Sequence, residues 1–352
     1  MELFSNLQRW IFGLEILWYL QWKVSNKKIK MKNRTKITLL SFLCIAVYAC
    51  VSYSKPKITE NGTPVNPDLF LVDGNTVTVT KVPCTLSNGT ETDCYKIVSK
   101  STPTDHEMGP WCPDNITDGA DKGGIWLENG EVYDVDGAFI ENMATLYNDS
   151  KWKMYDANGD IYTTETKEDC ANAANPNVGE EYENFCVECL PSYITDLTQT
   201  YLIPVVPANS NVNNNFGRPG PPGRRSNGPS HRGIAFNGVV FDAPAPTDAI
   251  LGAYTLAPFD DAGGHINLNA GYHYHAATGV STQIAQTDNH AAMIGYAMDG
   301  NGLYAQLDAN GNKPENLDEC RGHSDEIRGY HYHVDAPGNN NFINCLKGAY
   351  VE

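Results

Sequence analysis

Six of the nine histidines in this chain lie in two copies of one short motif. The copies, residues 260–275 and 318–333, read DDAGGHINLNAGYHYH and DECRGHSDEIRGYHYH. Every matched residue is offset by 58 positions, so the pattern D-[DE]-x-x-G-H-x5-G-Y-H-Y-H is an internal duplication. Neutral imidazole is the commonest nitrogen ligand for zinc and copper in proteins. The duplication therefore points first to metal binding.

The spacing inside each copy places its histidines on one face of a strand. Side chains alternate between the two faces of an extended chain, so the two histidines of Tyr-His-Tyr-His share a face and the two tyrosines share the other. The preceding glycine suits a turn that lets the earlier histidine fold back toward that face. The sequence thus predicts three converging imidazoles in each copy, namely His265, His273 and His275, and His323, His331 and His333.

Several other residues are candidates to support such a metal. The motif carboxylates are expected to orient imidazoles or complete the coordination: Asp260, Asp261, Asp318 and Glu319. His290 and Asp299 are further candidates for the outer layer of residues around the metal ligands. Together with Asp242 they are also candidates for the general base that a metal-dependent hydrolase needs. No nucleophile elbow, HExxH or phosphate loop occurs.

Two functional hypotheses remain open at this point. In the first, the paired motifs bind zinc or copper, with or without hydrolase or oxidase activity. In the second, the histidines and tyrosines form a hydrogen-bonded structural seam in a non-catalytic adhesion or glycan-binding module. Duplication copies structural residues as faithfully as ligands, so repetition alone does not separate the two.

A hairpin signal precedes each motif. Residues 234–241 and 294–304 each place an Asn-Gly or Asp-Gly turn between apolar arms. Two units, each a hairpin followed by a histidine strand, are expected to pair about a pseudo-twofold axis with the histidine strands facing each other across the seam. The predicted fold class is mainly β, with antiparallel hairpins, this internal duplication, a sandwich- or barrel-like form and disulfide cross-links.

Eight of the ten cysteines follow residue 50, an even number that indicates disulfides in an exported chain. Cys84 with Cys94 and Cys320 with Cys345 are the predicted pairs, because each closes a short local loop. Cys186-x-x-Cys189 has the spacing of half a zinc site or a redox pair. Without a second CxxC, structural disulfides are the preferred interpretation.

Charge and the N-terminal region indicate export. The formal net charge of -17 argues against nucleic acid or anionic lipid as partners. A basic cluster, residues 27–36, precedes an apolar run, residues 37–49, of signal-peptide length. Cys50 follows a loose lipobox, so a lipid anchor there is the alternative to plain secretion. The expected location is secreted or anchored to the outer membrane of a bacterial envelope, with a glycan or cell-surface ligand as a candidate partner.

Composition divides the chain into six segments. Residues 105–207 hold hairpin signals at 126–133 and 152–162 and a short predicted helix near 137–147. The DxNxD and DxNxN runs at 156 and 308 lack the glycine of a calcium loop and are predicted to be turns. The segments are a spurious N-terminal extension (1–30), a signal peptide (31–50), a tether with a small strand pair (51–104), the hairpin region (105–207), a Gly/Pro/Asn/Arg loop (208–232) and the duplicated repeat (233–352).

The duplicated Gly-Tyr-His-Tyr-His resembles the YHYH-domain family, which is named for this tetrapeptide. The resemblance rests on 271–275 and 329–333 with their Gly-His pairs, on 294–300 and 318–320, and on 111–113 and 124–127. It extends over residues 105–350. The family consists of exported bacterial proteins without an agreed activity, so the resemblance implies localisation more than chemistry. In one departure between the copies, Ala262 stands where the second copy has Cys320.

Overall fold

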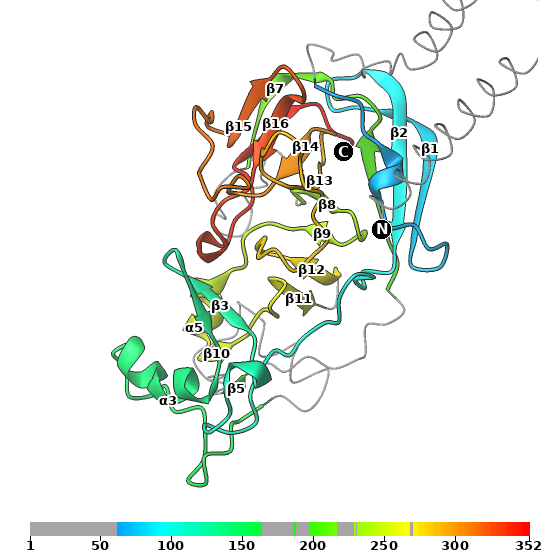
Figure 1. Cartoon of the computed structure of the whole chain (residues 1–352). Helices are drawn as coiled ribbons and strands as arrows, with labels where there is room; N and C mark the ends of the chain where they lie inside the picture. Colours follow the sequence, from blue (N-terminus) through cyan, green and yellow to red (C-terminus); the bar gives the residue numbers. More distant parts are fainter. Residues whose placement is uncertain (1–61, 164–185, 188–196, 217–228, 230, 268–269) are drawn as a thin grey trace, which may run out of the picture. The chain divides into compact units, whose positions relative to one another are not determined.

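The computed structural model describes residues 62–163, 186–187, 197–216, 229, 231–267 and 270–352 (Figure 1). The predicted N-terminal extension, the signal peptide, Cys50 and Cys189 lie outside these ranges. No helix within the described ranges has the length and hydropathy needed to cross a bilayer.

An eight-stranded sheet carries both motif copies. Its strand order is β11-β12-β9-β8-β13-β14-β16-β15. From the central pair outward, each half presents the two strands of a hairpin, then a histidine strand, then an edge strand. The bounds are β8 (Gly233–Ala235), β9 (Val240–Phe241), β11 (Gly264–Asn267), β12 (Gly271–Tyr274), β13 (Met293–Ala297), β14 (Gly302–Tyr304), β15 (Gly322–Asp325) and β16 (Gly329–His333).

The two halves of the sheet also share their register. His265 on β11 lies opposite His273 on β12, and His323 on β15 lies opposite His331 on β16. β12 runs parallel to β9, as β16 runs parallel to β14. At the centre β8 and β13 pair antiparallel, as a twofold relation requires. The predicted duplication of hairpin plus histidine strand is therefore confirmed.

The histidine strands nevertheless do not face each other. Four strands lie between β12 and β16, because the hairpins occupy the middle of the sheet (Figure 1). The hairpin residues Ile234, Phe241 and Ile294 are buried. The expected meeting of the histidines across a seam is wrong, and a single site shared by both copies is excluded. The sheet is open, with β11 and β15 at its edges, so the mainly β prediction holds without a closed barrel in the described residues.

The N-terminal part follows its local sequence signals. β1 (Val77–Thr85), β2 (Glu91–Ser99) and β6 (Gln199–Pro204) form an antiparallel sheet in which Cys84–Cys94 joins β1 to β2. β3 (Ile125–Glu128) and β4 (Glu131–Asp134) turn at Asn129-Gly130, and both turn residues have positive φ. α3 (Gly137–Leu146) begins after Asp136, whose side chain accepts a hydrogen bond from the N–H of Phe139.

One strand lies where a loop was predicted. β7 (Asn209–Asn215) pairs antiparallel with β17 (Cys345–Gly348). Its sequence gave no strand signal, because backbone hydrogen bonding requires no alternation of apolar and polar residues. The predicted disulfide Cys320–Cys345 links β17 to the second motif. The remaining elements are β5 (Cys186–Val187), β10 (Thr255–Leu256), α5 (Thr247–Gly252), η1 (Pro67–Leu69), η2 (Ala120–Lys122) and η4 (Pro337–Asn339).

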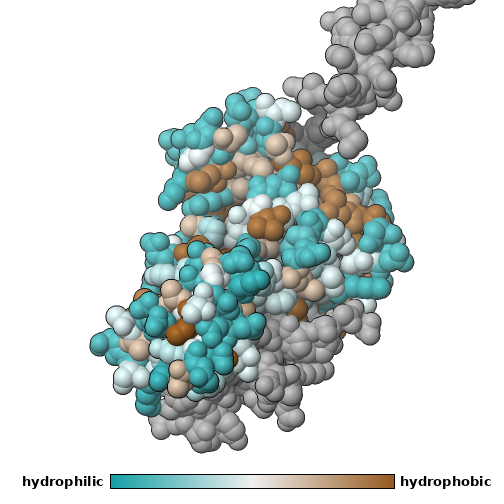
Figure 2. Space-filling view, turned by 60° about the horizontal axis from the view of Figure 1, so that its bottom comes forward, coloured by the Kyte–Doolittle hydropathy of each residue, from teal (hydrophilic) through white to brown (hydrophobic). Residues whose placement is uncertain are grey.

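Two large hydrophobic clusters stabilise these elements. One is built on the eight-stranded sheet and includes the motif tyrosines Tyr272, Tyr274 and Tyr332. The other joins Trp126 and Trp152 to α3 and α5, so these tryptophans belong to the core. The face drawn in Figure 2 is mostly hydrophilic with scattered apolar residues, in keeping with the acidic composition.

Candidate metal centre

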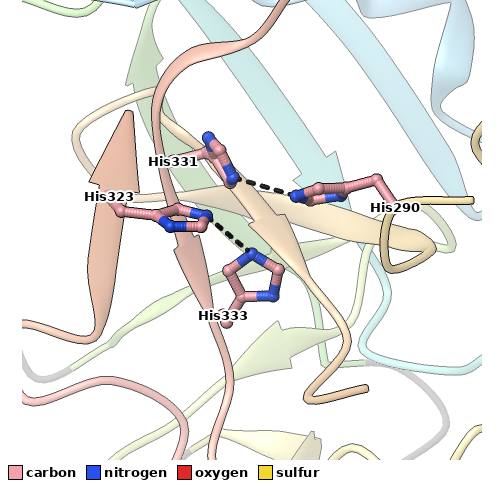
Figure 3. Close-up of side chains that lie close together, drawn as sticks. All are labelled: His290, His323, His331 and His333. Atoms are coloured by element: carbon pink, nitrogen blue, oxygen red, sulfur yellow. Dashed lines mark hydrogen bonds between the residues drawn. The ribbon is translucent and has the colours of Figure 1, made fainter. Parts of the chain in front are cut away.

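Four histidines converge in the second half of the sheet (Figure 3). β15 supplies His323, β16 supplies His331 and His333, and the segment ahead of β13 supplies His290. One ring nitrogen from each lies within 4.8 Å of the other three. His331 and His333 are buried, whereas His290 and His323 are half-buried. Among the described residues this is the one such group of histidine, cysteine, aspartate or glutamate side chains.

Backbone carbonyls fix the orientation of all four rings. The Nδ1 atoms of His290 and His323 lie 3.1 Å from the carbonyl oxygens of Ala291 and Glu315. The Nδ1 atoms of His331 and His333 lie 2.9 and 3.0 Å from those of Gly329 and Ala305. A carbonyl oxygen only accepts, so each Nδ1 carries the proton and each Nε2 of a neutral ring presents a lone pair. In known metal sites, a ligating histidine typically donates the N–H of its other ring nitrogen to a backbone carbonyl, a carboxylate or water.

The Nε2 atoms then face each other in pairs. His290 and His331 approach to 3.1 Å, and His323 and His333 approach to 3.2 Å, as the dashed lines of Figure 3 show. Two unprotonated nitrogens at this distance repel and cannot hydrogen-bond. A tetrahedral zinc ion with bonds of about 2.0–2.1 Å places its ligand atoms about 3.3–3.4 Å apart. The paired spacing is thus close to what such an ion requires.

Burial favours the neutral form of three of these imidazoles, those of His290, His331 and His333. Burial lowers the pKa of His331 to about 4 and that of His333 to about 3, and neighbouring histidines lower both further. Burial also lowers the pKa of His290. Neutral imidazole is the form that ligates a metal. At neutral pH these three side chains therefore present ligand nitrogens rather than positive charges.

A buried arginine attaches the His290 segment to the second motif. Nη2 of Arg328 lies 2.5 and 2.6 Å from the two carboxylate oxygens of Asp288, and Nη1 lies 2.5 Å from Asp325. The Arg328 side chain is only 6 % exposed, so both ion pairs are partly shielded from water. Burial raises the pKa of Asp325, but hydrogen bonds from Arg328 and backbone N–H groups outweigh it and lower the pKa to about 2. We call Asp288, Arg328 and Asp325 the arginine clamp.

A cavity of about 420 Å³ adjoins the four histidines. Three of them, His290, His323 and His333, line it, while His331 does not. The arginine clamp forms part of the wall, and the Asp308 turn and Lys313 form another part. The Asp308 carboxylate accepts hydrogen bonds from the N–H groups of Asn310 and Asn312, which makes this segment the predicted turn. A metal held by the four Nε2 atoms would therefore face a cavity that is large enough for a small molecule.

The first motif copy has the same backbone and different side-chain surroundings. The ring centroids of His265 and His273 are 6.0 Å apart, against 4.6 Å for His323 and His331. Asn267 and Ala270 stand where the second copy has the clamp residues Asp325 and Arg328. His275 packs against Phe259 with 5.3 Å between ring centroids. The three histidines of the first copy are buried and do not belong to the group of four converging histidines.

The other candidate residues of the sequence bond elsewhere. Asp260 accepts hydrogen bonds from Tyr272 and Gly264, and Asp318 from Tyr330 and Gly322. Each of these two carboxylates therefore accepts hydrogen bonds from residues of its own motif copy. Glu319 pairs with Lys347, Asp299 accepts from Tyr332, Asp242 bonds His231, and Asp261 is exposed. In the described residues, backbone carbonyls rather than these carboxylates hold the Nδ1 atoms of the four converging histidines.

The buried first-copy histidines predict a loss of stability in mild acid. Burial lowers the folded-state pKa of His265 to about 3, below its unfolded value of 6.5. The unfolded state therefore binds more protons below pH 6.5, and the stability held above that pH is lost as the pH falls toward 3. We expect about 2 kcal/mol less unfolding free energy from this residue at pH 5 than at pH 7, measured by urea denaturation of metal-free protein. A His265→Gln variant should show a shallower slope between these pH values, and equal slopes would contradict this assignment.

Comparison with known proteins agrees with the motif. Residues 204–314 match the family model described as YHYH protein. The match includes the first motif and His290 and ends before the second motif, so it is narrower than the expected 105–350. No match was found among curated proteins or among solved structures. The stretch from residue 204 to residue 314 is therefore similar to the YHYH proteins, as its Gly-Tyr-His-Tyr-His motif indicates.

Proposed function

We propose that this protein binds one transition-metal ion, zinc or copper, through the Nε2 atoms of His290, His323, His331 and His333. The proposal is carried by one observation: four Nε2 atoms converge while each Nδ1 lies against a backbone carbonyl. This arrangement leaves four lone pairs with a shared centre. An all-imidazole donor set suits zinc or copper better than calcium or magnesium, which prefer oxygen ligands.

A catalytic role is the further part of this proposal. A structural zinc site is closed, whereas a catalytic metal keeps a position accessible to substrate. Here four imidazoles would fill a tetrahedral sphere, so substrate would have to enter as a fifth ligand; three of the four rings line a cavity of about 420 Å³, which supplies the approach for it. Zinc or copper bound there supplies Lewis acidity, and copper also supplies redox chemistry. A metal-dependent hydrolase or oxidase is the activity class that fits.

Export of the protein is proposed together with its function. The disulfides Cys84–Cys94 and Cys320–Cys345 are compatible with an oxidising compartment, where disulfides persist. The apolar run before residue 50 supports a secreted or envelope-anchored bacterial protein, and Cys50 is the residue that would carry a lipid.

The second candidate function is a non-catalytic adhesion or glycan-binding module. It is favoured by the first motif copy, whose histidines are buried beside Phe259 and the motif tyrosines, as structural residues would be. This role and a metal in the second copy are compatible within one chain. Without metal binding, the structural role would extend to both copies.

Metal titration of residues 51–352 tests the proposal. The protein is produced by export so that its disulfides form, stripped with chelator and titrated with zinc and with copper by calorimetry. We expect one equivalent of either ion per chain, because the second copy alone has converging ligands. Binding of two equivalents would show that the first copy also binds, and the absence of binding for both ions would refute the metal hypothesis.

A further inference from the structure

We propose that the cavity beside the four histidines binds a small monocarboxylate, held between the bound metal and the ammonium group of Lys313. This inference rests on the metal binding proposed above and names the class of ligand for the same site. It is drawn from the charges that line the cavity, from their partners and from the histidines that the cavity exposes.

The charge of the cavity changes sign when a divalent ion binds. Three carboxylates, Asp288, Asp308 and Asp325, line it together with two cations, Arg328 and Lys313. With neutral imidazoles the lining carries one net negative charge, which favours entry of a cation. A bound divalent ion reverses this to one net positive charge. A monoanion would then neutralise the occupied site.

Lys313 is the lining cation that remains available for that anion. Asp288 and Asp325 both pair with Arg328, so the guanidinium charge is already balanced. The Asp308 carboxylate accepts hydrogen bonds from backbone N–H groups of its own turn. Within the described residues Lys313 is exposed and forms no ion pair, although it lines the cavity next to Asn312 and Pro314. Its ammonium group is therefore free to donate charge-assisted hydrogen bonds to a carboxylate.

The position of His331 relative to the cavity indicates from which side a bound metal would be approached. His331 is buried and does not line the cavity, whereas His290, His323 and His333 do. The four rings therefore hold the ion from its buried side and from its flanks. Because four imidazoles would complete a tetrahedral sphere, a further ligand would enter as a fifth one from the cavity side, where Lys313 is part of the lining. One carboxylate there would contact the metal and Lys313 together.

The test uses cobalt-loaded residues 51–352 with acetate as the probe, because cobalt absorption in the visible range reports anion binding without requiring any activity. We expect acetate to change the spectrum saturably, and chloride at equal ionic strength to change it much less. Lys313→Met should weaken acetate binding about tenfold while cobalt affinity is unchanged or slightly higher. Lys313→Arg, which keeps the charge, should restore most of the acetate affinity.

The controls separate this inference from the metal hypothesis. Lys122→Met removes an exposed lysine outside the cavity and should leave acetate binding unchanged. Equal acetate affinity in the wild type and in Lys313→Met, or no spectral response in cobalt-loaded wild type, would overturn the carboxylate site and leave metal binding intact. If the wild type binds no cobalt, zinc or copper, metal binding fails first and the carboxylate site fails with it.

Discussion

Replacing His331 with alanine is expected to weaken zinc and copper binding more than about 100-fold. Loss of residues that merely orient a ligand already costs about 10–100-fold in metal affinity, and His331 would be a ligand. Its Nε2 lies 3.1 Å from that of His290, and its ring is buried behind the cavity, so no solvent-exposed group can replace it. Calorimetric titration of the metal-free variant measures the effect.

The first motif copy supplies the matched control. His273 is the counterpart of His331 in sequence and in register, and its Nδ1 likewise lies against a backbone carbonyl. His273→Ala should lower the unfolding free energy, because it leaves a cavity in a buried region, yet should preserve one equivalent of metal. Equal loss of metal in the two variants would mean that both copies contribute, or that metal binding depends on overall folding. Circular dichroism of each variant distinguishes these two cases.

Replacing Arg328 with methionine is expected to lower metal affinity about 10–100-fold without removing a ligand. Arg328 holds Asp288, two residues ahead of His290, to Asp325, two residues after His323. Without it the His290 segment loses its charged attachment to the second motif. The electrostatic effect has the opposite sign, because removing a positive charge favours a nearby cation. We expect the positional loss to dominate, because a displaced His290 removes one of four ligands, whereas the two carboxylates left without Arg328 are partly exposed and screened by water.

Two further variants separate position from charge. Arg328→Lys keeps the charge and loses the two-pronged contact, so it should also weaken binding. Lys347→Met removes an ion pair with Asp318 in the same motif without touching the His290 segment, and should leave metal affinity unchanged. Nitrogen hyperfine coupling in the copper form should fall from four coordinated imidazoles to three in Arg328→Met. Four imidazoles and wild-type affinity in this variant would contradict the role given to the clamp.

The regular parts of the fold were predictable because their signals are local. An Asn-Gly turn between apolar arms determines a hairpin within a few residues, and the duplicated Gly-Tyr-His-Tyr-His gave the two matching strands β12 and β16. The two predicted disulfides close short loops and have formed. Each of these features depends on residues that are near one another in the chain.

The arrangement of the two halves depends on long-range pairing that the motif does not encode. A pseudo-twofold axis could pass between the two histidine strands or between the two hairpins. In this sheet the two hairpins lie next to the axis. β7 was missed because its asparagines carry no strand signal, although its backbone pairs with β17. Both outcomes are decided by partners that are distant in sequence.

The sequence identified some of the residues of the candidate metal site and not others. His323, His331 and His333 were identified from the repeat, but His290 was given a supporting role because it lies outside the motif. The residue 58 positions before it is Arg232, so the repeat gives no counterpart. The clamp was missed because Asp288 and Arg328, which it joins, are 40 residues apart in the sequence, although Asp325 and Arg328 are only three apart. Asn267 and Ala270 at the matching positions of the first copy are a signal that the copies had diverged.

Anomalous diffraction from a zinc-loaded crystal of residues 51–352 tests the central claim most directly. We expect one strong peak at the zinc absorption edge, about 2.0–2.1 Å from the Nε2 atoms of His290, His323, His331 and His333. The peak should disappear below the edge, which separates zinc from a lighter ion or water. Absence of density between these four rings, or a zinc peak among His265, His273 and His275 instead, would contradict the proposed metal centre.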